Sequence, residues 1–161
     1  MRIKVPFHKQ KTIYNCGPAA LQIIFNYFGI SITQTELEKK LETDPDNGTS
    51  HKKIIEVARE YGLFCYVNND SSLKEVYYFL QQRLPAIVNF IEPSNDESHY
   101  AVIIGINKQS VLLNDPWNGK NFKIKKKEFD KRWHNEEGTN KRWIIVFAKE
   151  DFALGKQYLP K

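Results

Sequence analysis

Apolar residues recur with the period of a helix soon after the start of the chain. Within residues 16–28 they stand one, three or four positions apart, at Ala20, Leu21, Ile24, Phe25 and Phe28, and this is the spacing of one helical face. Pro18 suits a first helical turn, because its missing N–H costs nothing there, and Gly29 suits the end. Since the segment holds few polar residues, we predict a largely buried helix.

Three further segments of the first half combine helical spacing with start signals. The predicted helices cover residues 33–41, 51–61 and 73–82. Thr33 with Glu36, and Ser72 with Glu75, form capping boxes, in which side chain and backbone satisfy each other's hydrogen bonds. Ser50 supplies a cap to the middle helix. The pattern therefore predicts four helices in the first half.

The second half favours strands. β-Branched and aromatic residues dominate five segments and a short sixth one, at 84–92, 99–107, 110–115, 121–125, 142–149 and 63–68. The turn "NKQS" joins the second and third of these into a hairpin. Helices followed by antiparallel strands predict an α+β domain, with a helical part at about 1–82 packed on one face of a sheet at about 84–150.

Length and composition fit a single domain covering residues 1–161. No run approaches the ~18 apolar residues of a membrane span, and the N-terminus lacks the apolar centre of a signal peptide. The two cysteines, Cys16 and Cys65, are too few for a disulfide framework, so we expect free thiols and a cytoplasmic location. The spacing of histidines and carboxylates suggests no metal site, and we expect no cofactor.

The net charge is +5, and much of the excess lies at 123–132, with six basic and two acidic residues. A basic segment can contact nucleic acid. It can equally be a solvated surface helix, and this interpretation is favoured because no nucleic-acid motif accompanies the charge. We therefore expect no nucleic-acid partner.

Candidate chemistry begins in "KQKTIYNCGPAAL", residues 9–21. A cysteine at a helix N-terminus faces unpaired backbone N–H groups and the positive end of the helix dipole, so the pKa of Cys16 should fall below about 8.5. Gly17 removes a side chain that would crowd an incoming carbonyl, and we expect it to contact substrate. This arrangement suits a nucleophile. Cys16 by itself also fits a small buried residue at a helix start.

A nucleophilic cysteine needs a base. His51 begins a predicted helix among lysines, where we expect it to be solvated, His134 lies at the end of a charged helix, and His8 has no evident orienting partner. His99 opens a strongly apolar strand, and Asp115 ends the partner strand of the same hairpin. Strand, turn and returning strand bring both to one end, where a carboxylate can hold an imidazole nitrogen. Singly, His99 also fits a core-edge histidine, and Asp115 before proline a turn start.

In combination these segments resemble a known family. The pattern "Q-x5-C-G-P-A-A-L", then "HYAVIIGI", then "VLLNDPW" is similar to the bacteriocin-processing, double-glycine leader peptidases, which are papain-like cysteine peptidases. The resemblance covers about residues 3–148. By matching position it implies that Gln10 lines the oxyanion hole, Cys16 is the nucleophile, His99 the general base and acid, and Asp115 the orienting carboxylate. Gln10 alone would pass for a surface glutamine.

The resemblance also implies a papain-like fold, a peptide or protein substrate cut after Gly-Gly or another small pair, and a peptide-exporting ABC transporter as partner. An apolar leader would dock away from the cut, and "FNYFGI" or "YYFL" can supply apolar residues for it, although membership of the hydrophobic core is the favoured interpretation of both segments. The chain departs from the family where Asn15 replaces the usual aspartate before the cysteine. With 161 residues and no transporter segments, it is expected to be a stand-alone member or an excised domain.

Two other functions fit the same residues. A Cys-His-Asp acyltransferase or transpeptidase would pass the acyl group to an amine instead of water. A catalytically silent domain would only bind peptide or another partner, with the basic segment 123–132 as its candidate surface, and an intact but unreactive Cys16 would indicate this function.

Overall fold

The computed structural model describes residues 1–161 and consists of five helices and six strands. The helices are α1 (Cys16–Tyr27), α2 (Gln34–Lys40), α3 (His51–Glu60), α4 (Leu73–Gln81) and α5 (Lys126–Arg132). The strands are β1 (Phe64–Asn68), β2 (Ala86–Ile91), β3 (Ser98–Ile106), β4 (Ser110–Asp115), β5 (Gly119–Lys125) and β6 (Ile144–Ala148). All ten predicted elements are present, with ends that differ by a few residues, so the α+β class is confirmed.

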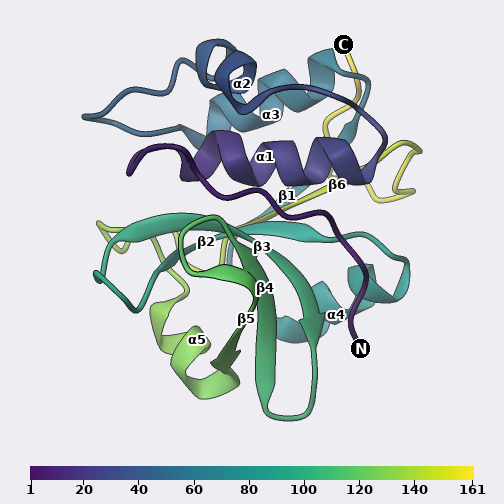
Figure 1. The fold of residues 1–161 in the computed structure, drawn as a ribbon. Coiled ribbons are helices and arrows are strands. Elements are labelled where there is room, and N and C mark those ends of the chain that lie inside the picture. Colours follow the sequence, from purple (N-terminus) through teal and green to yellow (C-terminus); the bar gives the residue numbers. More distant parts are fainter.

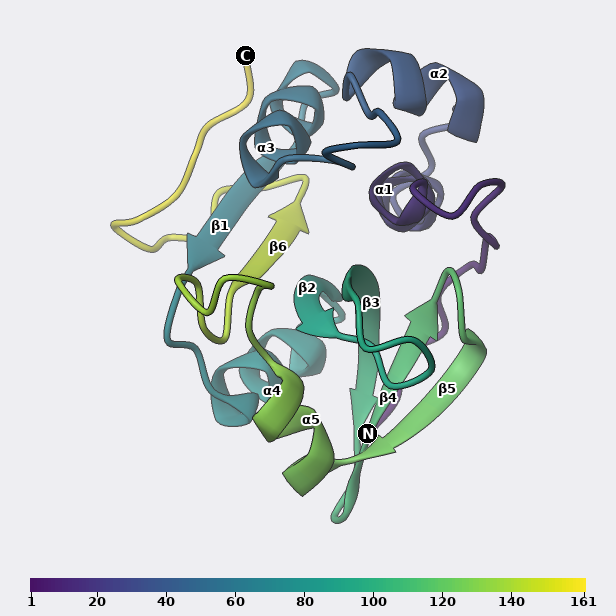
Figure 2. The same ribbon diagram turned by 90° about the vertical axis from the view of Figure 1, so that its left-hand side faces the viewer.

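The six strands form one antiparallel sheet in the order β1-β6-β2-β3-β4-β5. Figures 1 and 2 show α1, α2 and α3 on one side of the strands and α4 and α5 on the other. The prediction of one helical layer on a single face was therefore wrong. The helical part and the sheet part are also not fully separated at residue 82, since β1 from the first half of the chain pairs with β6 near its end. Amphipathic spacing shows that a helix is packed, but not on which face.

Helix α1 is the centre of the hydrophobic core, as its composition predicts. Its buried side chains include Leu21, Ile24 and Phe25, and the helix packs against β3 and α2. The predicted caps of the outer helices are confirmed, because the hydroxyls of Thr33, Ser50 and Ser72 each accept a backbone hydrogen bond from three residues on. In contrast, Asn15, which precedes α1 at the cap position, makes no side-chain cap.

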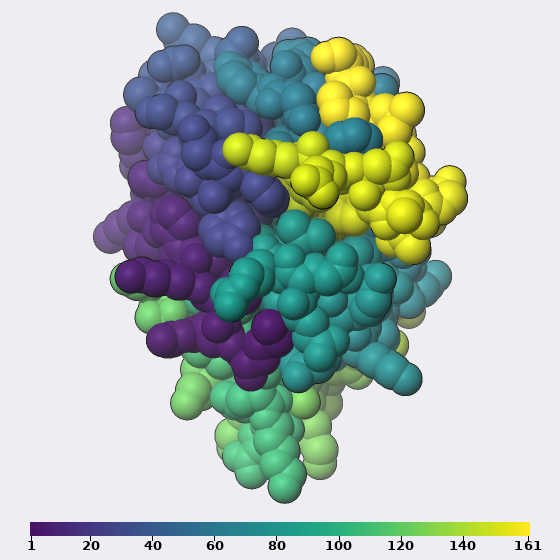
Figure 3. Space-filling view, turned by 90° about the vertical axis from the view of Figure 1, so that its right-hand side faces the viewer, coloured from purple at the N-terminus to yellow at the C-terminus, as the bar shows by residue number.

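Both ends of the chain are bound to the domain. The N-terminal segment runs beside β3, where the N–H of Ile3 donates to the carbonyl of Ile104 at 2.9 Å. The C-terminal segment lies on the surface, in yellow in Figure 3. It covers β1, since Tyr158 and Cys65 exchange two backbone hydrogen bonds of 2.8 and 3.0 Å. Cys65 is thereby fully buried, whereas Cys16 is partly exposed.

Candidate active site

Cys16 is the first residue of α1, and its thiol faces a helix end that nothing caps. The first-turn N–H groups of Cys16 and Gly17 have no side-chain acceptor, and Pro18 has no N–H to satisfy. Such a terminus favours a negative charge, because unpaired N–H groups and the helix dipole both stabilise it. The predicted position of the cysteine at a helix N-terminus is confirmed.

The hairpin of β3 and β4 brings His99 and Asp115 together, as the sequence predicted. Val102 pairs with Asn114 in the ladder, so both residues lie at the same end of the hairpin. The Nε2 atom of His99 is 2.5 Å from the Oδ1 atom of Asp115. The other ring nitrogen, Nδ1, is free of the carboxylate, and the imidazole lines the same cleft as the thiol of Cys16.

Charge pairing outweighs burial at the thiol and the imidazole. Burial raises the pKa of Cys16, but the charge of His99 and its hydrogen bond lower it, and the net result is a lowered pKa. Burial lowers the pKa of His99, but the charge of Cys16 and the hydrogen bonds that the imidazolium donates to Asp115 and Cys16 raise it to about 10. The arrangement therefore favours a thiolate beside an imidazolium.

Asp115 is fully buried and bound by more than the imidazole. Its Oδ1 accepts from the backbone N–H groups of Trp117 and Asn118 at 2.9 and 3.1 Å, and its Oδ2 from the side chain of Asn118 at 3.0 Å. Burial raises the pKa of this carboxyl, but the hydrogen bonds and charge of His99 outweigh it, so the pKa is lowered. The carboxylate both starts the turn before β5 and orients His99.

Behind Asp115 lie two residues that sequence reasoning missed. The side chain of Asn118 also donates to Glu92 at 3.1 Å, and Glu92 is itself buried and accepts the N–H groups of Ser94 and Asn95. This network holds Asn118 against the orienting carboxylate. The only sequence signal was the position of Asn118 three residues after Asp115, which is typical of a turn.

Gln10 lies in the loop that leads to Cys16. Its side-chain Nε2 donates to the carbonyl of Thr12 at 2.8 Å, and the N–H of Asn15 donates to the same carbonyl at 3.3 Å. Its own N–H donates to the carbonyl of Pro116, beside Asp115. The amide is buried, and its Oε1 atom has no hydrogen-bond partner. The loop thus brings the Gln10 amide next to the residue that precedes the thiol.

Gly17 was expected to contact substrate, but in the structure it packs against Thr49. It is buried in the first turn of α1 and does not line the cleft. A Cβ atom on Gly17 would lie 2.5 Å from the Cβ of Thr49. The missing side chain therefore allows α1 to approach the loop before α3, and this close packing, instead of room for a substrate carbonyl, accounts for the glycine.

A cleft of about 680 Å³ opens at Cys16 and His99. Its walls come from the loops that lead into α1, α3 and β3 together with the first residues of those elements, from Asn89 of β2 and from the segment 135–137. Ile13 lines it with 80% of its surface exposed. His51 also lines it, and here the expectation of a solvated histidine was wrong, because its ring stacks on Trp143 at 3.8 Å between centroids. Sequence reasoning missed this contact because Trp143 is distant in the chain, whereas the lysines next to His51 indicated solvent.

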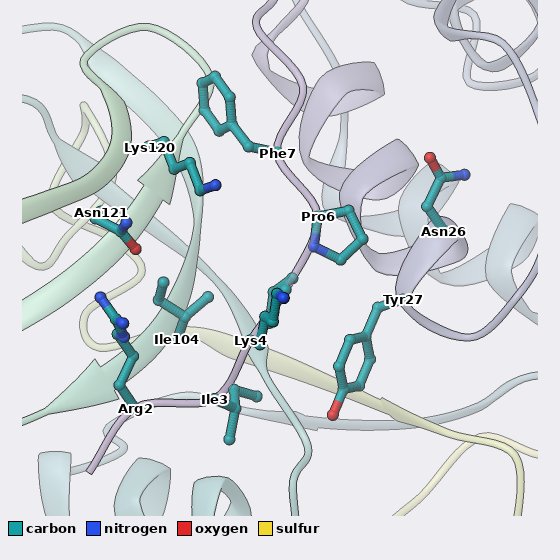
Figure 4. Close-up of a pocket in the computed structure, with 11 residues that line it drawn as sticks. Arg2, Ile3, Lys4, Pro6, Phe7, Asn26, Tyr27, Ile104, Lys120 and Asn121 are labelled. Carbon is teal, nitrogen blue, oxygen red and sulfur yellow. The ribbon is translucent and has the colours of Figure 1, made fainter.

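A second hollow lies elsewhere, between the N-terminal segment, the end of α1 and the start of β5. It measures about 770 Å³, and Figure 4 shows its lining, in which Phe7, Pro6 and Tyr27 are accompanied by Arg2, Lys4 and Lys120. No cysteine or histidine lines it. It offers apolar and cationic contacts, but no nucleophile with a base.

The family model of the Peptidase C39 family matches residues 4–137. The chain therefore belongs to the Peptidase C39 family, a family of cysteine peptidases. This confirms the resemblance on which the site residues were first aligned. The matched segment contains Cys16, His99 and Asp115.

Relatives of this chain include proteins of quite different length. An uncharacterized protein of Methanothermobacter thermautotrophicus is 30% identical over 107 residues, which are 66% of this chain and 68% of that protein. The pediocin PA-1 transport/processing ATP-binding protein PedD of Pediococcus acidilactici is 26% identical over 121 residues, which are 74% of this chain and 16% of PedD. The second match is thus confined to a small part of a much longer protein.

Solved structures share the fold. The double glycine motif protease of an AMS/PCAT transporter, in complex with the leader peptide, has a TM-score of 0.72 and 23% identity, and the match covers 91% of this chain and 92% of that one. The peptidase domain of Streptococcus ComA has the same TM-score and identity and covers 91% and 98%. In our structure no helix has the length and apolar character needed to cross a bilayer.

Proposed function

We propose that this protein hydrolyses peptide bonds with a catalytic triad of Cys16, His99 and Asp115. One observation carries the proposal: the imidazole of His99 is held at Nε2 by a fully buried carboxylate and shares a cleft with the thiol at the uncapped end of α1, and the imidazole and the thiol shift each other's pKa. A nucleophile, a base and an orienting group in this order are what acyl transfer requires. The open cleft beside the thiol gives a peptide access.

The proposed reaction has two halves. The thiolate of Cys16 attacks the scissile carbonyl carbon, and the carbonyl electrons move to oxygen. When the tetrahedral intermediate collapses, the C–N bond breaks, and Nδ1 of His99 gives its proton to the leaving amine. Water then attacks the thioester and gives a proton to Nδ1, and the C–S bond breaks to restore thiolate and imidazolium. Asp115 holds Nε2 throughout.

The oxyanion would be stabilised by two donors. The N–H of Cys16 is unpaired at the start of α1, and the Nε2 of Gln10 has a second proton beyond the one donated to Thr12. One such donor typically contributes ~3–4 kcal/mol to lowering the barrier. We therefore assign Gln10 to the oxyanion hole.

For the substrate, we propose a leader peptide that ends in Gly-Gly. The fold is shared with a double glycine motif protease, and PedD is a transport/processing protein. The hollow of Figure 4 offers Phe7, Pro6 and Tyr27 to the distal part of such a leader, and of the two predicted docking segments only 25–30 contributes to it. This hollow lies at the end of α1 opposite Cys16, and the twelve residues of α1 span about 18 Å. A transporter partner and a cytoplasmic, reducing location fit the same proposal.

The test is a library of quenched-fluorescent peptides with and without glycine at the two positions before the cut. We expect kcat/KM to be highest for Gly-Gly, and Cys16→Ala to remove turnover while leaving the fold intact. Preference for bulky residues at those positions would keep the peptidase but reject the leader specificity. Acyl transfer to added amine in place of water would indicate a transferase, and turnover by Cys16→Ala would reject the nucleophile.

A further inference from the structure

A second histidine faces the catalytic cleft, and the proposed mechanism gives it no role. His51 lines the same cleft as Cys16 and His99. Its ring stacks on the buried Trp143, with 3.8 Å between centroids and 11° between planes. Its Nδ1 atom is 2.5 Å from the hydroxyl oxygen of Tyr100. Two contacts on different parts of the ring therefore fix its position and its rotation.

The hydrogen bonds determine which nitrogen of His51 carries the proton. The hydroxyl of Tyr100 donates to the carbonyl of Thr49 at 2.9 Å, and a carbonyl can only accept. Burial raises the pKa of Tyr100 well above its ordinary value, so the hydroxyl keeps its single proton. Because that proton is committed to Thr49, the oxygen must accept from His51. Nδ1 is therefore the protonated nitrogen.

The remaining nitrogen, Nε2, is consequently an acceptor. It makes no hydrogen bond within the protein and is not enclosed by protein atoms. Burial of the ring lowers the pKa of His51 to about 4, so the ring is neutral near pH 7. The cleft thus contains a lone pair of fixed direction whose partner has to come from outside the chain.

A backbone N–H of a bound peptide is the partner that suits this atom. An extended peptide presents such donors at regular intervals, and main-chain hydrogen bonds supply affinity without demanding a particular side chain. A lysine side chain of the substrate would find better partners in the carboxylates that also line the cleft, among them Glu97, Glu136 and Glu137. Water can occupy the position until substrate displaces it.

We propose that His51 is a substrate-binding residue whose Nε2 atom accepts a hydrogen bond from one backbone N–H of the peptide, while Tyr100 and Trp143 hold it in that tautomer and orientation. The proposal rests on the proposed peptidase function, because it needs a peptide in the cleft. It adds a contact beyond the triad and the oxyanion hole, and it predicts that one particular amide of the substrate matters.

The experiment is an N-methyl scan of the best-cleaved Gly-Gly peptide, in which each backbone N–H in turn is replaced by N–CH3. His51→Phe keeps a ring to stack on Trp143 but has no nitrogen. We expect its kcat/KM for the unmethylated peptide to fall about five-fold, mostly through KM, the equivalent of ~1 kcal/mol for one hydrogen bond. In the wild type, methylation of the N–H that His51 binds should lower kcat/KM, and this loss is the N-methyl penalty at that position. In His51→Phe the penalty at that one position should vanish.

His8→Phe is the matched control, because His8 lines neither the cleft of Cys16 nor the hollow of Figure 4, and it should retain every penalty. An identical penalty at all positions in wild type and His51→Phe would overturn the proposal. Failure of the peptidase function itself would be distinct, since wild type would then cleave no peptide at all.

A measurement without substitution at His51 guards against misfolding of the variant. In Cys16→Ala protein, long-range proton–nitrogen NMR should show the Nδ1–H tautomer of His51. Addition of the uncleaved peptide should move the Nε2 resonance upfield, as expected when a lone pair accepts a hydrogen bond. An Nε2–H tautomer, or a resonance unchanged at saturating peptide, would also reject the role.

Discussion

At the scale of single residues, the two thiols show how position decides reactivity. Cys16 lies at the uncapped end of α1 beside His99, and both surroundings favour its thiolate. Cys65 lies in β1 under the C-terminal segment, where burial raises its pKa to about 12. The same side chain is therefore a candidate nucleophile at one position and an apolar core residue at the other.

Alkylation by iodoacetamide should separate the two cysteines. We expect only Cys16 to react near pH 7, with a rate that rises through a midpoint below the ~8.5 of a free thiol, and His99→Ala should move that midpoint upward. Mass spectrometry of the labelled peptides measures this, with Cys65→Ala as the control that leaves the profile unchanged. Faster labelling of Cys65 in the native protein would contradict the assignment.

The pH profile of hydrolysis should report the thiolate–imidazolium pair. As the pH rises through the lowered pKa of Cys16 the thiolate forms and kcat/KM increases. As the pH rises further toward the pKa of His99, about 10, the imidazolium loses its proton and kcat/KM declines. In Asp115→Asn the alkaline limb should move to lower pH, because the hydrogen bond that raises the pKa of His99 is weakened.

Asp115→Asn should also lower kcat, by on the order of 10²–10⁴-fold. This loss should be smaller than that of Cys16→Ala, because a carboxamide can still hold the imidazole, although in the wrong tautomer. Stopped assays across the pH range measure both effects. An Asp115→Asn enzyme with the wild-type rate and profile would show that the carboxylate does not orient His99.

At the scale of elements, α1 depends on contacts with loops from elsewhere in the chain. Its first turn approaches the loop before α3 through Gly17 and Thr49. The same loop is held on β3, since the Tyr100 hydroxyl donates to the Thr49 carbonyl. The end of α1 that carries the thiol is therefore positioned by packing against the loop before α3, which β3 holds in place, and not by a side-chain cap.

Gly17→Ala should be destabilising, because the added Cβ would lie 2.5 Å from the Cβ of Thr49. Overpacking of this kind costs about 1–3 kcal/mol, which urea unfolding can measure. Gly155→Ala is the matched control, since its Cβ would meet nothing within 4 Å, and it should change the free energy of unfolding by less than ~0.5 kcal/mol. Thr49→Gly should partly rescue Gly17→Ala, and equal stability of the two alanine variants would refute the packing role.

At the scale of the whole molecule, charge is divided between two hollows. The protein carries a net charge of +5, yet the cleft is lined by five carboxylates and by no lysine or arginine, the acidic residues being Asp46, Asp96, Glu97, Glu136 and Glu137. Arg132 neutralises one of them through its 2.7 Å contact with Asp96. The hollow of Figure 4 has the opposite character, with three cations and no carboxylate.

A substrate with lysine near the cut should therefore be preferred over the same peptide with glutamine. We expect an advantage of about two- to five-fold in kcat/KM at low ionic strength, the size of exposed charge pairs, that declines as salt is added. The double variant Glu136→Gln/Glu137→Gln should reduce the advantage, and Glu38→Gln, on α2 outside the cleft, should not. A preference that is independent of salt would exclude an electrostatic origin.

Sequence alone determined the features that depend on neighbouring residues. The capping hydroxyls, the helix that begins at Cys16 and the hairpin that brings His99 to Asp115 all follow from local periodicity and chain connectivity, because a cap, a turn or a strand pair lies within a few residues of its own signal. Family resemblance then singled out Gln10, which no local pattern distinguishes.

Only the tertiary structure decided the remaining features, because their partners are distant in the chain. Neither the packing of α4 and α5 on the second face of the sheet nor the contact of Gly17 with Thr49 is encoded in the periodicity of either segment. Lysines around His51 indicated solvent, whereas Trp143 and Tyr100 turn it into an oriented group of the cleft. Such placements arise from many weak contacts summed over the core, and no single stretch of sequence contains them.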